Sequence, residues 1–249
     1  MRALHAEWTK VRTSPGTVWL LLALGLVIIA VGAIAAAGVG CAAPGCPVDT
    51  ARISLTGVQV GQAVVAILAV LAMGGEYSNG LIRTTLTALP RRWDVLVAKA
   101  AVVVVLVAVT GAVAVPATAA VGRFILTDRG MLRLGEDSLP RAMLGSVLYL
   151  LLIAVLSLGV AAATRDSATA IGVVLGLLYV LPIVAQAVDD PEWQERLLRL
   201  APMSAGLSIQ ATTDLDSLPI GPWPGLGVLA AWAMAAIAIG GGVLLRRDA

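Results

Sequence analysis

"TVWLLLALGLVIIAVGAIAAAGVG", residues 17–40, is a run of 24 residues without a charged side chain. An α-helix needs about 20 apolar residues to cross the hydrocarbon core of a bilayer, because the core is about 30 Å thick. Five more uncharged runs follow, at 53–75, 100–122, 142–164, 167–188 and 217–245. The last begins with the proline-rich "SLPIGPWPG", so we expect its helix to cover 225–245. We predict an all-α, polytopic membrane protein with six transmembrane helices in a single transmembrane domain, residues 1–249.

Composition supports this fold class. Charged residues make up 13% of the chain, against about a quarter in a soluble domain, and the mean hydropathy is +0.94. The runs lack the alternation of apolar and polar residues that a membrane β-barrel requires. The net charge of +2 is too small to indicate nucleic-acid binding.

The distribution of charge predicts the orientation of the chain. With a cytoplasmic N-terminus, the inner segments carry ten basic and five acidic residues, a net charge of +5. The outer loops then carry seven basic and ten acidic residues, a net charge of −3. Cytoplasmic loops are enriched in Lys and Arg, so we expect both termini in the cytoplasm. Arginine outnumbers lysine 15 to 2, a bias typical of a GC-rich bacterial genome, and the location expected is a bacterial plasma membrane.

Two segments next to the spans are amphipathic. Residues 1–16 place Leu4, Trp8 and Val11 on one helical face, which predicts an interfacial helix that ends at a Pro-Gly break. In the outer loop 189–224, "PEWQERLLRL" places Trp193, Leu197 and Leu200 on one side. We expect the rest of this loop to dip back towards the bilayer.

The cytoplasmic loop 76–99 interrupts the apolar runs with a polar, basic segment. Within "GEYSNGLIRTTLTALPRRWDVLVAKA", residues 75–100, apolar side chains recur with helical spacing from Leu81 to Leu89, and Pro90 ends the pattern. A helix of nine residues spans about 13 Å and is marginal alone in water. It must therefore rest on lipid headgroups, on the bundle itself or on a partner.

The sequence argues against several kinds of chemistry. Neither lysine, Lys10 or Lys99, is followed by Ser or Thr, so no P-loop for ATP is present. The one histidine, His5, precedes the first span, which excludes a His-x-x-x-His zinc site and disfavours an intramembrane hydrolase. No charged residue interrupts a run, which disfavours proton-coupled transport. We predict no catalytic, cofactor-binding or metal site in this chain.

A few neutral polar residues lie inside the runs. Those on the second and fifth spans are candidates for a substrate path: Gln59, Gln62, Tyr179 and Gln186. Others, such as Ser146, Tyr149 and Ser157, are of the kind that bonds neighbouring helices, and this structural role applies to the whole set as well. Cys41 and Cys46 flank a Pro-Gly turn on the predicted outer side and are candidates for a disulfide; their spacing leaves their oxidation state open.

The chain resembles the six-span permease subunits of type-2 ATP-binding-cassette exporters, of the small bacterial kind. The resemblance rests on three stretches: "AEWTKVRTSPGTVW", the loop "GEYSNGLIRTTLTALPRRWDVLVAKA", and the end, with "APMSAGL", "GPWPGLGVLAAW" and "GGGVLLRRDA". The loop residues that carry it are Glu76, Tyr77, Gly80, Ile82, Arg83, Leu86 and Pro90.

The resemblance implies that the short helix in this loop docks on a separate nucleotide-binding ATPase subunit, which would hold ATP and Mg²⁺. A second permease copy, identical or not, would complete the assembly. The implied coupling residues are the seven named above with Leu81 and Arg91, and the implied entry-helix residues are Glu7, Trp8, Lys10 and Arg12. Glu76 and Arg83, about two turns apart, are expected to pair.

The expected function is export of an amphipathic or hydrophobic substrate, driven by ATP that the partner hydrolyses. The alternative is a membrane assembly or sensor subunit that couples to an ATPase without transport. In either case, we do not expect the chain to be an enzyme by itself.

Overall fold

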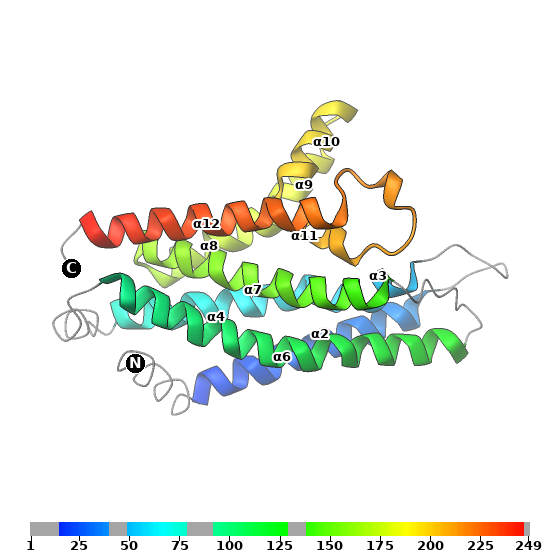
Figure 1. Cartoon of the computed structure of the whole chain (residues 1–249), viewed down its shortest axis with the longest axis horizontal. Helices are drawn as coiled ribbons and strands as arrows, with labels where there is room; N and C mark the ends of the chain where they lie inside the picture. The colour runs from blue at the N-terminus through cyan, green and yellow to red at the C-terminus, as the bar shows by residue number, and fades with distance from the viewer. Residues whose placement is uncertain (1–14, 40–48, 79–91, 129–137, 247–249) are drawn as a thin grey trace.

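The computed structural model describes residues 15–39, 49–78, 92–128 and 138–246, and within these ranges all regular structure is helical (Figure 1). Six helical stretches are long and apolar enough to cross a membrane, which confirms the predicted fold class. The principal helices run back and forth along one axis: α2 (Pro15–Gly38), α4 (Thr56–Ser78), α6 (Arg92–Asp128), α7 (Leu139–Thr164), α8 (Ser167–Leu175) and α12 (Pro222–Arg246). We call the end of the bundle where α2 begins and α12 finishes the terminal end, and the opposite end the far end.

The first span shows how an almost uniformly apolar sequence is divided between two environments. Its buried residues, Leu24, Ile28, Gly32 and Ala36, recur every four positions and therefore form one stripe along the helix. The other faces of α2 carry exposed large side chains, including Trp19, Leu26 and Ile34. Such a surface is stable in lipid, where apolar exposure carries no penalty.

Helix α7 lies at the centre and packs against α4, α6, α8 and α12. Small residues allow the closest approaches. A Cβ on Gly159 of α7 would lie 2.4 Å from the carbonyl carbon of Ala236 on α12, and one on Gly240 would lie 2.4 Å from the carbonyl oxygen of Gly159. Helices in lipid gain contact energy from this kind of close backbone packing.

Helix α2 is joined to its neighbours in the same way. The short helix α3 (Thr50–Ser54) precedes α4, and the Thr118 hydroxyl of α6 lies 3.2 Å from the carbonyl oxygen of Ile28 and 3.1 Å from that of Ser54. Gly32 faces this point, where an added Cβ would meet the Thr118 hydroxyl at 2.1 Å. The contact ties α2, α3 and α6 together.

The fifth span is irregular. It consists of α8, the π-helical segment η1 (Gly176–Val180) and α9 (Leu181–Gln186), with Pro182 in the first turn of α9. The Leu181 N–H bonds to the Gly176 carbonyl oxygen, five residues back. Because proline removes a backbone donor and crowds the preceding turn, a local widening of the helix is the expected response.

Several boundaries differ from those expected from sequence. Pro15 and Gly16 belong to α2 rather than breaking the chain, since proline fits the first turn of a helix. Helix α6 begins at Arg92, so residues 92–99 are helical instead of part of the loop 76–99, and α12 begins at Pro222 instead of residue 225. The predicted interfacial helix lies, apart from residues 15 and 16, outside the described residues.

The segment 189–224, predicted to be an outer loop, is largely structured. It contains α10 (Pro191–Leu200), α11 (Pro202–Leu207) and the short 3-10 turns η2 (Ser208–Gln210) and η3 (Leu215–Ser217). Helix α11 and η2 are buried and pack on α7 and α12, whereas α9 and α10 project sideways from the bundle (Figure 1). This segment therefore returns to the core after one excursion.

Candidate functional site

Most of the predicted coupling residues fall outside the part of the chain that can be described. This applies to Gly80, Leu81, Ile82, Arg83, Leu86, Pro90 and Arg91, to the entry-helix residues Glu7, Trp8, Lys10 and Arg12, and to Cys41 and Cys46. Glu76 and Tyr77 lie in the last turn of α4. The end of α4 and the start of α6, which flank residues 79–91, are both at the terminal end (Figure 1).

Three of the four candidate path residues meet inside the bundle. Gln62 on α4 is fully buried and accepts a hydrogen bond at Oε1 from the hydroxyl of Tyr149 on α7. The Tyr179 hydroxyl of η1 donates to the backbone carbonyl oxygen of Gln59 at 2.7 Å. Gln59 lies one turn before Gln62 on α4, so these two hydrogen bonds bring Gln62, Tyr149 and Tyr179 into one polar cluster. Gln186 is not part of it, because this residue is exposed at the end of α9, about two turns further on.

The polar cluster is neutral and incompletely bonded. Among the described residues the Gln62 Nε2 atom has no hydrogen-bond partner, although the side chain is fully buried. Leaving a buried donor unsatisfied costs about 1–3 kcal/mol, so the site retains an unused capacity to bind an acceptor oxygen. Gln62 lies six residues from the start of α4, about 9 Å along the axis, in the far half of the bundle.

Tyr149 is the member of the cluster that is not among the predicted path residues. Its ring is fully buried, and it packs against the backbone of α11, where a Cβ on Gly206 would lie 2.6 Å from the ring. The ring thus connects the returning segment to Gln62. A tyrosine within an otherwise apolar run is a signal for a buried hydrogen bond, but it does not identify the partner.

A second connection lies beside the cluster. Gln210 of η2 is buried and donates from Nε2 to the Ser146 hydroxyl at 3.0 Å, and Ser146 donates to the Ala142 carbonyl oxygen within α7. Gly145 faces Ile209 so closely that a Cβ there would lie 2.0 Å from that side chain. These contacts seat η2 against α7.

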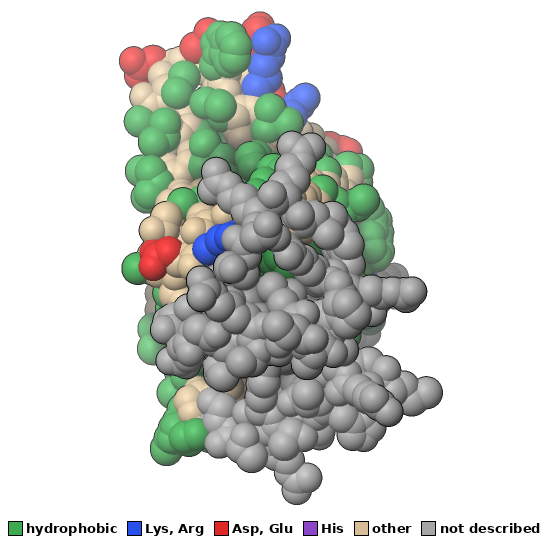
Figure 2. All heavy atoms as spheres, turned by 90° about the vertical axis from the view of Figure 1, so that its left-hand side faces the viewer, with side chains coloured by type: hydrophobic (Ala, Val, Ile, Leu, Met, Phe, Trp, Pro, Cys, Tyr) green, Lys and Arg blue, Asp and Glu red, His purple; other side chains and the backbone are tan. Residues whose placement is uncertain are grey.

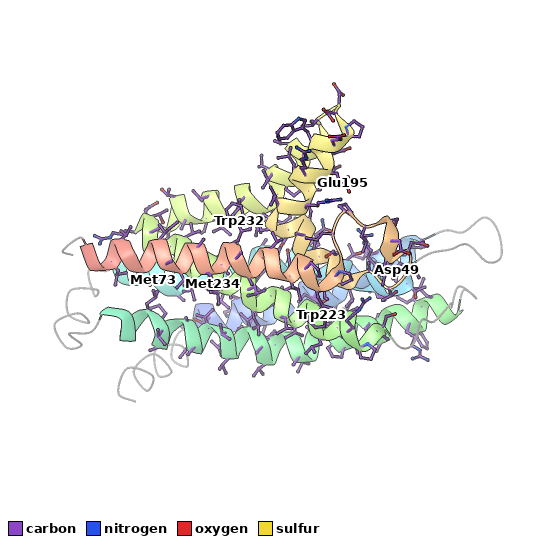
Figure 3. All side chains as sticks on the ribbon, turned by 45° about the horizontal axis from the view of Figure 1, so that its top comes forward. Asp49, Met73, Glu195, Trp223, Trp232 and Met234 are labelled. Carbon is purple, nitrogen blue, oxygen red and sulfur yellow. The ribbon has the colours of Figure 1, made fainter. Side chains whose placement is uncertain are left out.

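At the far end, Asp49 binds two parts of the chain that are distant in sequence. Its Oδ1 accepts from the Arg52 N–H at 2.9 Å, which caps α3, and from the Thr212 hydroxyl at 2.7 Å. Its Oδ2 accepts from the N–H groups of Thr212 at 2.6 Å and Thr213 at 3.3 Å (Figure 3). We call these contacts the Asp49 clamp. Arg141 of α7 holds the same segment, because its Nη2 donates to the Ala211 carbonyl oxygen at 2.6 Å.

At the terminal end, a tight turn joins α7 and α8. Arg165 adopts a left-handed backbone with φ 59° and donates from Nη2 to the Val243 carbonyl oxygen of α12 at 3.2 Å. Asp166 caps α8 by accepting from the Thr169 N–H at 2.7 Å, and this hydrogen bond lowers the pKa of the Asp166 carboxyl. The turn is therefore anchored to both α8 and α12.

The end of α4 contacts this turn directly. A Cβ added to Gly74 would lie 1.9 Å from the Ser167 hydroxyl, at the first residue of α8. Met73, the preceding residue, is buried at the same end of the bundle (Figure 3). The backbone of α4 thus packs against the first side chain of α8, at the end where α4 leads into residues 79–91.

The described residues contain no cluster of three or more His, Cys, Asp or Glu side chains that could hold a metal ion. The helices are apolar on their outer faces and joined inside by neutral hydrogen bonds, features that define a multi-pass helical membrane protein. The family model described as "ABC-2 family transporter protein" matches residues 3–183, well over half of the chain. The chain belongs to this family of membrane transporter proteins, which generally partner with an ATPase subunit. Comparison with curated proteins finds no match.

Proposed function

We propose that this chain is the permease subunit of an ATP-binding-cassette exporter, working with a separate ATPase that holds ATP and Mg²⁺. The family supports a transport role. The sequence has no P-loop of its own, so the driving energy must come from another chain. In this proposal both termini and residues 79–91 are cytoplasmic, and a second permease copy completes the complex.

The contact between Gly74 and Ser167 carries the mechanical part of the proposal. A force applied by the ATPase to residues 79–91 acts first on the last turn of α4. Because the Gly74 backbone packs directly against the Ser167 side chain there, movement of α4 would displace the start of α8. Helix α8 continues through the π-helical segment η1 to α9, so displacement at the terminal end is passed to the far half of the bundle.

The polar cluster provides the proposed substrate contact. Gln62 and Tyr179 lie at the junction of α4 and η1, the two elements that would move together. Gln62 Nε2 offers a donor to a carbonyl or hydroxyl oxygen, and the surrounding helices offer apolar surface. An uncharged polar group on a hydrophobic body, as in an amphipathic compound, suits this arrangement.

The test is co-purification of the chain with its ATPase, followed by Arg83→Glu. This reversal places a negative charge in the proposed docking helix, so we expect loss of the complex and of substrate-stimulated ATP hydrolysis. Arg129→Glu, the same change in a loop predicted to lie on the other side of the membrane, is the matched control and is expected to leave both unchanged. An intact, substrate-stimulated complex in the Arg83→Glu variant would contradict the proposed docking.

Transport is measured in the same preparation. Substrate-dependent ATP hydrolysis together with substrate accumulation in inverted vesicles is expected for an exporter. A stable complex that hydrolyses ATP without moving any tested amphipathic compound would favour the assembly or sensor subunit instead. Removing charge at Glu76 with Glu76→Gln tests the proposed pairing with Arg83, and unchanged transport and ATPase stimulation would count against that pairing.

A further inference from the structure

Helix α10 is the one α-helix in the described part of the chain that has no buried residue. It leaves the bundle sideways together with α9 (Figure 1). Its first turn is capped within the chain, because Asp190 accepts hydrogen bonds from the N–H groups of Glu192 and Trp193 and Pro191 begins the helix. A capped helix of ten residues therefore lies outside the core of its own chain and needs a surface to rest on.

The sequence of α10 places three kinds of surface around the helix. Gln194, Leu197 and Leu198 are half-buried and form the side towards the rest of the chain. Trp193 and Leu200, seven residues apart and so on one face, are 57% and 62% exposed. The third face carries Glu192, Glu195, Arg196 and Arg199.

The charged side chains on the third face are paired with one another. Arg196 pairs with Glu192 and Arg199 pairs with Glu195, each one turn apart along the helix. Figure 2 shows these acidic and basic side chains together at the top of the molecule, on the projecting element. The helix has two arginines and two glutamates and hence no net charge. Arg196 also stands over the Trp193 ring, 5.4 Å from its centroid, so the boundary between charged and apolar faces is held by a cation–π contact.

The depth of α10 is fixed by α12. The indole Nε1 of Trp232 donates to the Leu200 carbonyl oxygen at 2.9 Å. Trp232 lies ten residues after Pro222, the first residue of α12, which is about 15 Å along the helix axis. The C-terminal end of α10 therefore lies within the length of a spanning helix. Next to it, α9 exposes Ile183 and Val184, which continue the lipid-facing surface of the fifth span.

We infer that α10 is a lipid-binding interfacial helix, inserted between the headgroups and acyl chains of the leaflet at the far end of the bundle. Trp193 and Leu200 enter the acyl region, and the paired charges face the headgroups. Amphipathic helices of this type usually lie about 5–10 Å into the interface. The Leu200 end of α10 is held deeper, about 15 Å along α12, so the helix enters the leaflet obliquely with Trp193 nearer the headgroups. Tryptophan favours that position because its ring is apolar and its N–H is polar. Because the charges are already paired, insertion does not need anionic lipid. The inference requires only that the bundle spans a bilayer, and it is independent of the proposed ATPase coupling.

The first test compares the full chain with its Trp193→Phe variant in phosphatidylcholine vesicles that contain brominated acyl chains. The difference between the two emission spectra isolates Trp193. We expect this difference emission to be blue-shifted relative to tryptophan in water and to be quenched severalfold by brominated lipid. Adding phosphatidylglycerol is expected to leave the extent of quenching unchanged. Quenching that appears only with the anionic lipid would overturn insertion by a self-neutralised helix.

The second test places spin labels on the full chain after Cys41→Ser and Cys46→Ser. Trp193→Cys and Leu200→Cys report the apolar face, and Glu195→Cys is the matched control on the charged face. Labels at 193 and 200 are expected to collide with oxygen severalfold more than with a water-soluble nickel complex, and the label at 195 is expected to show the reverse. High nickel access at 193 would mean that water covers the face and would overturn the inference.

A second copy of the chain could cover the same face. Low access of both reagents at 193 and 200, with broadening from nearby labels, would show such a contact and would also overturn the inference. The brominated-lipid comparison needs only Trp193→Phe, and it decides the question even if the cysteine-free variants do not reconstitute.

Discussion

Replacing Asp49 with asparagine tests whether the Asp49 clamp holds the returning segment in place. The side chain keeps its shape, and its amide oxygen can remain at the Oδ1 position, where it still caps α3 through the Arg52 N–H. Asparagine is nearly as good an N-cap as aspartate, so α3 should persist. At the Oδ2 position, however, an NH₂ group would face the N–H groups of Thr212 and Thr213, which now donate to a carboxylate.

The expected loss follows from these contacts. A hydrogen bond to a charged group contributes about 1.5–3 kcal/mol, and partial exposure of Asp49 puts each bond at the lower end. Losing the 2.6 Å bond and the weaker 3.3 Å bond should cost about 2–3 kcal/mol. Because every 1.4 kcal/mol is a factor of ten, local opening of residues 212–213 should become about 30- to 140-fold more frequent.

Amide hydrogen exchange on the full chain in detergent or nanodiscs measures this opening directly. Thr212→Val is the graded control, because it removes only the hydroxyl bond to Oδ1 and should accelerate exchange about tenfold, for roughly 1.5 kcal/mol. Exchange at the start of α3 reports the cap and should stay nearly constant in both variants. If Asp49→Asn exchanged at residues 212–213 no faster than the unaltered chain, the clamp would not be what fixes this segment.

Three further predictions concern other contacts. Gly159→Val should destabilise the α7–α12 contact by about 1–3 kcal/mol, because a Cβ there meets the Ala236 backbone, and the loss should appear as a lower melting temperature. Gly172→Ala is the control: an added Cβ there meets nothing within 4 Å, so the change should be neutral or slightly stabilising. Equal effects of the two substitutions would refute close packing as the cause. Tyr149→Phe should lower the free energy of unfolding by about 0.6–1.7 kcal/mol, the range for hydrogen bonds between membrane helices. Tyr149→Ala should cost more, because it also removes the buried ring. A cost of zero for Tyr149→Phe would mean that the bond to Gln62 does not stabilise the fold. The Asp166 carboxyl, which caps α8, has a pKa below its ordinary value of 3.8. Its stabilising effect on α8 is therefore fully present above pH 3.8 and is lost as the pH falls through the lower pKa of the folded state. Amide exchange at Thr169 should become faster in that acid range, and this pH dependence should be absent in Asp166→Ala.

The number and type of the main helices were predictable because they depend on local composition. A stretch such as 17–40 has no charge to place in lipid, and in lipid its backbone groups can bond only within the helix. The same logic fails at helix ends. Pro15 and Arg92 look like loop residues in sequence, but proline suits a first helical turn and an arginine beyond the bilayer carries no burial cost.

The polar cluster was predictable in part for a similar reason. A glutamine within an apolar span must find a partner, so Gln59 and Gln62 stood out, and Tyr179 did so for its hydroxyl. Which side chains meet was not readable, since Tyr149 is 87 residues from Gln62 and Tyr179 is 120 residues from Gln59. Gln186 shares their chemistry but lies on an exposed turn, away from the polar cluster.

By itself, the sequence determined that this chain is a six-helix membrane protein and that it holds no P-loop motif, because both properties follow from residues that are neighbours in the chain. Tertiary structure alone decided that Asp49 would hold Thr212, that Gly74 would meet Ser167, and that α10 would stand outside the bundle. These contacts depend on the rotation and axial offset with which apolar helices pack. Apolar surfaces match one another in many registers, and the register is chosen by small residues and buried hydrogen bonds that come from distant parts of the chain.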